Sequence, residues 1–125
     1  MNIPADLFDP SHYAGVRKPL LEASTMPVWT YTSEEFYKRE VERIFMKVWN
    51  FLGRVEQVPG PGDYFAASFA GVPLIVLRGE DGKVRAFANT CRHRGSELLE
   101  GKGQCKAIIC PYHSWTYSTS NSLEH

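Results

Sequence analysis

The spacing of apolar residues changes once along the chain, near residue 49. Before that point, apolar residues recur at helical spacing at Val41, Ile44, Phe45 and Val48. The stretch Thr32–Glu35 precedes them, and a hydroxyl residue followed three positions later by Glu has the capping-box pattern that opens a helix. We therefore predict one helix, from about Ser33 to Lys47, whose apolar stripe packs in a core.

After the helix the apolar period shortens towards two, which is the period of a β-strand. Such runs predict strands at residues 49–55, 64–69, 74–77, 84–89, 106–109 and 115–118. Pro59–Gly62 supplies one turn, and Gly79–Gly82 makes a short hairpin loop between two apolar runs. Residues 49–120 are therefore predicted to form a mainly β domain.

The first 31 residues show little periodicity. They contain four prolines, at positions 4, 10, 19 and 27. Because proline breaks regular elements, we predict an extended arm at residues 1–31 that lies over something larger and is less ordered than the rest. With 125 residues the chain is about one domain long. The expected order is the arm, a helix at residues 32–48 packed on the domain, and the β domain.

Charge and hydropathy exclude several classes of partner. Fourteen basic and fourteen acidic residues cancel, so no long-range field attracts nucleic acid or anionic lipid. No run approaches the about 20 apolar residues of a membrane span. The N-terminus also lacks the basic start and apolar stretch of a secretory signal. We therefore expect a cytoplasmic protein with no membrane and no nucleic-acid partner.

Two cysteine–histidine pairs carry the candidate chemistry. One residue separates Cys91 from His93, two separate Cys110 from His113, and each pair follows a predicted strand. In a reducing compartment, cysteines beside histidines are more typical of metal ligands than of disulfides, which leaves Cys105 as a structural residue. Two thiolates and two imidazoles suit either zinc or an iron–sulfur cluster, so ligand type alone leaves both open.

Ligand spacing favours the cluster. Structural zinc sites usually have two to four residues between their first ligands, and a single intervening residue fits them poorly. A Rieske [2Fe-2S] centre instead takes one Cys and one His from each of two loops. The plain alternative is buried cysteines with core histidines. Gly95 and Pro111, which stand beside the four residues in this order, argue against that alternative.

The flanking residues resemble a known family. The segments CRHRG and CPYHSWTY, with EVERIFMKVWNFLGRVEQVPGPGDYF and DGKVRAFANTCRHRG upstream, resemble the N-terminal Rieske domain of aromatic-ring-hydroxylating oxygenase large (alpha) subunits. The resemblance covers nearly all of residues 30–118, and it implies an antiparallel β-sandwich with two cluster-binding loops. It implies that one iron is bound by Cys91 and Cys110 and the other by His93 and His113. Residues implied to lie next to the cluster are Arg94, Gly95, Trp115 and Tyr117.

Respiratory-chain Rieske proteins are a less similar branch. They carry an extra Cys in each loop, where this chain has Ser96 and Tyr112. They also donate a hydrogen bond to the cluster from a Ser at the position of Trp115, whereas Tyr117 does match their second donor. Loss of one donor predicts a reduction potential towards the end near about −150 mV of the Rieske range.

The resemblance implies a one-electron relay. In the family, the Rieske domain receives an electron from a ferredoxin or flavin reductase. It passes the electron to a mononuclear Fe(II), commonly in a neighbouring subunit of a trimer. That iron is held by two His and one carboxylate in a larger catalytic domain, where O₂ is activated for aromatic hydroxylation. The parent protein is thus expected to be an oxidoreductase, a dioxygenase of aromatic hydrocarbon catabolism.

The catalytic domain is expected to be absent from this chain. Only His12 and His125 remain outside the two pairs, and they cannot form the iron site of that domain. Residues 121–125 are interpreted as a truncation point or tag remnant, because Leu123–His125 resembles the junction of a histidine tag. The fragment alone is then an electron-transfer domain. Two alternatives stay open: a free-standing Rieske-type electron carrier and a zinc-stabilised interaction module.

Overall fold

The chain folds as two compact units in a computed structural model that describes residues 3–120 and 123–124. The first unit is Met1–Asn50 and the second is Phe51–His125. The boundary lies two residues after the predicted start of the β domain. The arm and the helix, predicted as separate segments, belong to one unit. That the helix packs on the β domain stays a prediction.

The first unit is helical in its described part. Its elements are η1 (Pro10–Tyr13), η2 (Val28–Tyr31), α1 (Glu34–Arg43) and η3 (Phe45–Lys47), where η denotes a 3-10 helix. Ser33 caps α1, and its hydroxyl accepts a hydrogen bond from the backbone N–H of Phe36 at 3.2 Å. The predicted reciprocal half of the capping box does not form, because the third helical position holds Phe36 and not a glutamate.

The helix α1 ends earlier than predicted. Ile44 has φ −120° and ψ −70°, outside the helical region, and the chain continues as the short turn η3. Ile44 and Val48 are 49% and 53% exposed. The prediction that the whole apolar stripe is buried in a core is therefore wrong for these two residues, and Val41 and Phe45 are only half-buried.

Aromatic side chains join the arm to α1. The ring of Phe36 lies 6.2 Å from that of Trp29 and 6.0 Å from that of Phe8. Tyr13 lies 6.1 Å from Trp29, and the guanidinium of Arg39 sits 4.8 Å above the Phe8 ring as a cation–π contact. The described part of the arm therefore folds against α1 within this unit.

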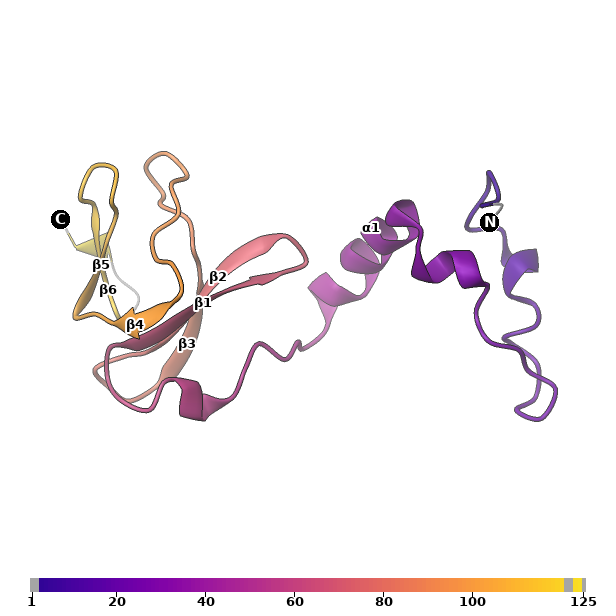
Figure 1. Cartoon of the computed structure of the whole chain (residues 1–125), viewed down its shortest axis with the longest axis horizontal. Helices are drawn as coiled ribbons and strands as arrows, with labels where there is room; N and C mark the ends of the chain where they lie inside the picture. Colours follow the sequence, from indigo (N-terminus) through magenta and orange to yellow (C-terminus); the bar gives the residue numbers. More distant parts are fainter. Residues whose placement is uncertain (1–2, 121–122, 125) are drawn as a thin grey trace. The chain divides into compact units, whose positions relative to one another are not determined.

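The second unit is mainly β, as predicted, with two antiparallel sheets (Figure 1). The strands are β1 (Asp63–Phe69), β2 (Val72–Arg78), β3 (Val84–Ala88), β4 (Lys102–Gln104), β5 (Ala107–Ile109), β6 (Thr116–Ser118) and β7 (Leu123–Glu124). One sheet has the order β3-β2-β1-β4 and the other β5-β6-β7. Five predicted strands are confirmed, within two residues at each end, as β1, β2, β3, β5 and β6, whereas β4 and β7 were not predicted.

The strand predicted at residues 49–55 is wrong. This stretch contains no strand, and its end passes into the 3-10 helix η4 (Val55–Gln57). The backbone N–H of Arg54 donates to the side-chain Oε1 of Gln57 at 2.7 Å, and the Arg54 carbonyl accepts from the Gln57 N–H at 3.0 Å. Local hydrogen bonds thus take the place of a ladder partner.

Strand β2 lies between two cores. Ile75, Val76 and Leu77 are all buried, and successive side chains of a strand point to opposite faces. Ile75 and Leu77 pack in one core with two cysteines, described below, while Val76 packs in a smaller one with Val58 and Phe65. The larger core is the base on which the candidate site is built.

Two remaining expectations concern the hairpin and the chain end. The predicted hairpin loop at Gly79–Gly82 is confirmed, since Gly79 N–H donates to the Lys83 carbonyl at 2.9 Å and closes the turn between β2 and β3. Of residues 121–125, Asn121, Ser122 and His125 lie outside the described residues. Leu123–Glu124 pair with β6, and the truncation or tag interpretation stays a prediction. Among the described residues, none of the helices has the length and apolar character needed to cross a bilayer.

Candidate metal centre

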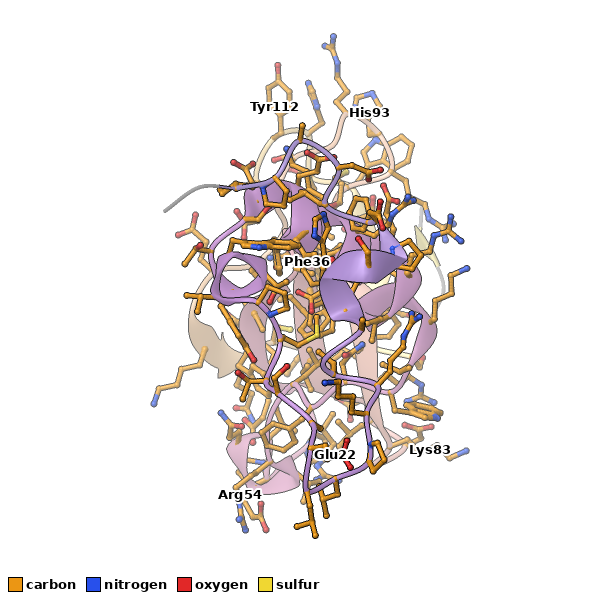
Figure 2. The ribbon with its side chains drawn as sticks, turned by 90° about the vertical axis from the view of Figure 1, so that its right-hand side faces the viewer. Glu22, Phe36, Arg54, Lys83, His93 and Tyr112 are labelled. Atoms are coloured by element: carbon orange, nitrogen blue, oxygen red, sulfur yellow. The ribbon has the colours of Figure 1, made fainter. Side chains whose placement is uncertain are left out.

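The four predicted ligands lie on two loops of the second unit. The first loop, residues 91–96, follows β3, and the second loop, residues 110–115, connects β5 to β6. Both extend to the same side of the strands in Figure 1. Figure 2 shows His93 of the first loop and Tyr112 of the second at the same end of the molecule. The topology therefore brings the two cysteine–histidine pairs together.

The two loops close with the same backbone hydrogen bonds. In the first loop, Cys91 N–H donates to the carbonyl of Ser96 at 2.8 Å, and Gly95 N–H donates to the carbonyl of Cys91 at 2.9 Å. In the second loop, the corresponding bonds run from Cys110 to Trp115 at 2.8 Å and from Ser114 to Cys110 at 3.0 Å. Each loop is thus a closed turn that begins at its cysteine.

The fifth residue of each loop has a left-handed backbone. Gly95 has φ +74° and Ser114 has φ +61°. This conformation lets the chain reverse and return to the strands. Glycine adopts it freely, whereas a serine Cβ meets the following carbonyl oxygen at some cost in free energy. The second loop therefore stores a small backbone strain that the first loop lacks.

Cysteine and histidine occupy different depths in both loops. Cys91 and Cys110 are 3% and 2% exposed, and they pack in the core with Ile75 and Leu77. The two thiols belong to the same buried cluster. His93 and His113 are exposed at the loop tips. The thiols thus form the base of the site and the imidazoles form its outer edge.

The two imidazoles are neighbours. Their ring centroids are 4.8 Å apart with an interplanar angle of 78°. Each ring also contacts an aromatic side chain of the second loop. Trp115 stacks on His93 at 4.8 Å and 14°, and Tyr112 lies against His113 at 3.9 Å and 38°.

Tyr117 is hydrogen-bonded to the base of the first loop. Its hydroxyl oxygen accepts the backbone N–H of Arg92 at 3.0 Å and lies 3.1 Å from the Cys91 sulfur, to which the hydroxyl donates when Cys91 is a thiolate. The hydrogen bond from Tyr117 lowers the pKa of the Cys91 thiol, although burial of the thiol opposes this. Burial raises the pKa of Tyr117 itself. Tyr117 thus acts as a donor that favours the thiolate needed for metal binding.

Asn89 is a positioning residue that the sequence reasoning missed. It is 1% exposed, and its Oδ1 accepts the backbone N–H groups of Leu98 at 3.1 Å and Leu99 at 3.0 Å. Its Nδ2 donates to the carbonyl of Leu99 at 2.7 Å and to a carboxylate oxygen of Glu97 at 3.0 Å. Asn89 therefore ties the end of β3 to the chain that returns from the first loop. The sequence signal that could have identified Asn89 is a polar residue directly after an apolar strand, two positions before Cys91.

The other predicted residues differ in their involvement. Arg94 is exposed at the loop tip, and Gly95 contributes through its backbone. Cys105 packs against the larger core, where burial raises the pKa of its thiol, as suits the structural role predicted for it.

The donor set fits a two-iron cluster. The four side chains are paired, thiol beside thiol and imidazole beside imidazole. A Rieske centre asks for this pairing, because each iron takes only two protein ligands, whereas a structural zinc ion takes four.

Comparison with known sequences also supports a two-iron cluster site. A family model described as the Rieske [2Fe-2S] domain matches residues 48–125. Choline monooxygenase, chloroplastic, from Spinacia oleracea is 43% identical over 105 residues, which cover 84% of this chain and 24% of that protein. The carnitine monooxygenase oxygenase subunit of Acinetobacter baumannii is 41% identical over 102 residues, covering 81% and 28%. The chain spans about a quarter of the length of these curated relatives.

Solved structures are similar over most of the chain. The quaternary ammonium Rieske monooxygenase CntA in complex with L-carnitine has a TM-score of 0.77 and 39% identity, covering 82% of this chain and 30% of that one. Naphthalene 1,2-dioxygenase from Rhodococcus sp. bound to indole has a TM-score of 0.69 and 38% identity, covering 74% and 21%. The predicted mainly β fold is thereby confirmed.

Proposed function

Because this chain belongs to the Rieske [2Fe-2S] domain family, we propose that it relays single electrons within a Rieske oxygenase alpha subunit, towards a mononuclear Fe(II) site elsewhere in the parent protein. The observation that carries this proposal is the paired donor set at two matched loops. Cys91 and Cys110 are the proposed ligands of one iron, and His93 and His113 those of the other. The bound cluster supplies one-electron chemistry that none of these side chains can perform.

The chain's own residues explain why the site suits a relay. The core around Cys91 and Cys110 excludes water from the thiolate side. Tyr117 stabilises the Cys91 thiolate through its hydroxyl. The imidazoles are exposed, so a second protein or domain can approach them closely. One side of the site is thus fixed and dry, while the other is open to a partner.

A ferredoxin or flavin reductase is the proposed electron donor, and the proposed acceptor is a catalytic domain of the same or a neighbouring alpha subunit in a trimer. Arg92 and Arg94 are exposed on the first loop, and Tyr112 is 60% exposed on the second. Arginine and tyrosine beside the imidazoles are the residue types enriched at protein interfaces, and the positive charge favours an acidic donor. The cytoplasmic location stays a prediction.

The substrate of the parent protein is a separate proposal. The resemblance seen in the sequence implies aromatic hydroxylation, which stays a prediction. A second candidate is oxidation of a quaternary ammonium compound. It is favoured because the CntA structure matches 82% of the chain with a TM-score of 0.77, against 74% and 0.69 for naphthalene 1,2-dioxygenase. Both matches lie in the electron-transfer region and not in the catalytic domain that is proposed to act on the substrate. The test is oxygen consumption and product formation by the intact parent protein with its reductase, using choline, L-carnitine and naphthalene in parallel.

The electron-transfer proposal is tested on the 125-residue chain. After anaerobic loading with iron and sulfide, iron, sulfide and zinc are quantified and the dithionite-reduced protein is measured by low-temperature EPR. We expect two irons and two sulfides per chain and a rhombic signal of low average g. A colourless, EPR-silent chain that retains one zinc would instead support the zinc-stabilised module and end the relay proposal.

Ligand variants make the same experiment residue-specific. His93→Ala and His113→Ala should each lose the reduced-state signal, because each removes one of the two imidazoles proposed to bind an iron. His12→Ala is the matched control, since His12 lies in the first unit. A wild-type yield of signal from His113→Ala would contradict the ligand assignment. The free-standing carrier is distinguished by the parent protein, which should contain a third, mononuclear iron per alpha chain.

A further inference from the structure

We propose that Trp115, on the second loop, is a positioning residue for His93 on the first loop, so that the second loop orients both imidazoles. The proposal rests on the proposed function only in so far as the imidazoles are iron ligands. The stacking of Trp115 on His93 is a property of the chain itself.

The geometry of this contact differs from that of the other ring pairs that involve a histidine or tryptophan. The Trp115 and His93 rings are nearly parallel, with centroids 4.8 Å apart and an angle of 14°. In the first unit, Trp29 meets His12 edge-on at 5.8 Å and 84°. Parallel rings at this separation lie in the stacking range of aromatic pairs, and the indole covers one face of the imidazole.

His93 depends on this contact for its orientation. It is an exposed side chain whose torsions are free in the absence of a partner, and fixing them costs conformational entropy. A metal-binding histidine is usually oriented by a hydrogen bond to its second ring nitrogen. The His93 ring nitrogens make no hydrogen bond to the described residues. The His93 ring meets His113 edge-on, but His113 is itself an exposed side chain. The parallel stack on Trp115 covers a whole face of the His93 ring and therefore sets its plane.

Trp115 is itself held in place by the second loop. Its carbonyl accepts the Cys110 N–H at 2.8 Å, and the next residue, Thr116, pairs with Ile109 in the β5–β6 hairpin. The left-handed backbone of Ser114 immediately precedes it. With 36% of its surface exposed, the indole is partly packed. The ring that orients His93 is therefore attached to a hairpin and not to a free loop.

The two aromatic side chains that contact the imidazoles, Trp115 and Tyr112, both come from the second loop. Tyr112, beside His113 in sequence, lies 3.9 Å from its ring at 38°. On the first loop the neighbours of His93 are Arg92 and Arg94, which offer no aromatic face. A change in the second loop should thus reach a ligand of the first. Fixed imidazoles also keep the exposed edge of the site in one geometry, as a preorganised site requires.

The stack is tested first on the metal-free chain by NMR. An imidazole beneath an indole has ring protons shifted upfield by the indole ring current. In Trp115→Leu, which keeps apolar volume but removes the aromatic face, the His93 resonances should move to the positions of an unstacked histidine. Trp115→Phe should retain part of the shift. Trp49→Leu, at an exposed tryptophan of the first unit, is the matched control and should change neither histidine.

The second measurement uses the chain loaded with iron and sulfide. Pulsed EPR of the reduced protein reports the couplings of the two coordinated imidazole nitrogens. Trp115→Leu should change one of them, and the cluster should be lost about 2- to 10-fold faster, the factor that corresponds to one aromatic pair. Trp115→Phe should restore the couplings and most of the lifetime.

The two measurements separate the possible outcomes. Unchanged His93 resonances in a Trp115→Leu chain with a native amide spectrum overturn the proposal. If Trp115→Leu does not fold, Trp115→Phe decides: a native fold with His93 at unstacked positions also overturns it. A chain that binds no iron contradicts the proposed function, while the metal-free spectra still decide whether Trp115 orients His93.

Discussion

The loops at residues 91–96 and 110–115 close with the same pair of backbone hydrogen bonds, and each begins at a buried cysteine. They differ in how the protein holds them. The second loop connects β5 to β6, which pair with each other directly. The first loop follows β3, and the next strand, β4, lies at the opposite edge of its sheet, in the order β3-β2-β1-β4. Strand pairing therefore closes the second loop but cannot close the first.

Side chains take over this task in the first loop. Asn89 ties the end of β3 to residues 97–99, and Tyr117 hydrogen-bonds to Cys91 and to the backbone of Arg92. The second loop in turn supplies the aromatic contacts on both imidazoles. The comparison teaches that one closed turn can be built twice, with strand pairing in one copy replaced by buried polar side chains in the other. Four predictions sharpen or break it.

Asn89→Ala should have the largest effect. It removes the acceptor of the Leu98 and Leu99 N–H groups, and Leu98 is buried, so a donor is left without a partner. We expect the free energy of unfolding to fall by about 3 kcal/mol, from unsatisfied buried groups and lost hydrogen bonds. Urea unfolding of the metal-free chain measures this.

A matched control for Asn89 is Gln104→Ala. Gln104 is exposed and donates a single side-chain hydrogen bond, to the carbonyl of Pro61 at 3.2 Å, so its removal should cost well under 1 kcal/mol. If the two variants are equally stable, the first loop is not held by Asn89, and the contrast between the loops fails.

The two left-handed loop residues should respond differently to substitution. Gly95→Ala places a Cβ at φ +74° with nothing within 4 Å, so its cost is backbone strain alone, about 1–2 kcal/mol. Ser114→Gly relieves similar strain but frees the unfolded chain, so the net change should stay within about 0.5 kcal/mol. Thermal unfolding of both variants gives the comparison.

Gly82→Ala measures the cost of backbone strain at a left-handed residue outside the two loops. Gly82 has φ +76° and also has nothing within 4 Å, but it lies in the hairpin between β2 and β3. Equal losses for Gly82→Ala and Gly95→Ala would show that backbone strain explains both. A Ser114→Gly chain less stable by more than about 1 kcal/mol would refute the strain assigned to the second loop.

Features with a local signal could be predicted from the sequence. Short apolar runs bounded by turn residues gave the positions of β1 to β3, and the run in β2 is continuous because that strand is buried on both faces. The two cysteine–histidine pairs were found by spacing, since a hydrophobic core seldom needs one Cys and His separated by one residue and another Cys and His separated by two. The helix start at Ser33 was predicted from its capping hydroxyl, whereas the predicted reciprocal hydrogen bond to a glutamate side chain does not form.

Features that depend on distant partners were missed. Strand β4 is Lys102–Gln104, a polar segment whose only strand signal is its pairing with Asp63–Phe65 of β1. The structural role of Asn89 depends on the chain returning to it ten residues later, where the Leu99 N–H donates to its side chain. The strand wrongly predicted at residues 49–55 shows the opposite error. The side chain of Gln57, three residues away, accepts the backbone N–H of Arg54, so this backbone group needs no partner strand. Ring contacts between the loops lie beyond any local pattern.

Tyr117→Phe should have a moderate effect confined to the first loop. It removes the hydroxyl that donates to the Cys91 sulfur and accepts from the Arg92 N–H, which should lower stability by about 1 kcal/mol. The reduction potential should also fall, because a donor to the cysteine sulfur stabilises the more negative reduced state. Potentiometric titration of the loaded chain measures the shift. Tyr64→Phe, which packs against the same core, is the control, and equal potentials in both variants would count against a donor role for Tyr117.

The smallest effect is expected at the other end of β3, where Asp81 forms a two-point ion pair with Arg85 at 2.8 and 2.7 Å. The hydrogen bonds from Arg85 hold the pKa of the Asp81 carboxyl well below its usual range. A carboxyl with a lowered folded-state pKa contributes stability that is present above its ordinary pKa of about 3.9 and is lost as the pH falls through the folded value. Asp81→Asn should therefore be slightly less stable than the natural chain at pH 7, and the difference should shrink below about pH 4.

Because Asp81 precedes β3 and the first loop follows β3, the EPR signal and the reduction potential should not change in Asp81→Asn. A changed signal would mean that β3 transmits strain to Cys91, and that Asn89 and Tyr117 are not sufficient to hold the first loop.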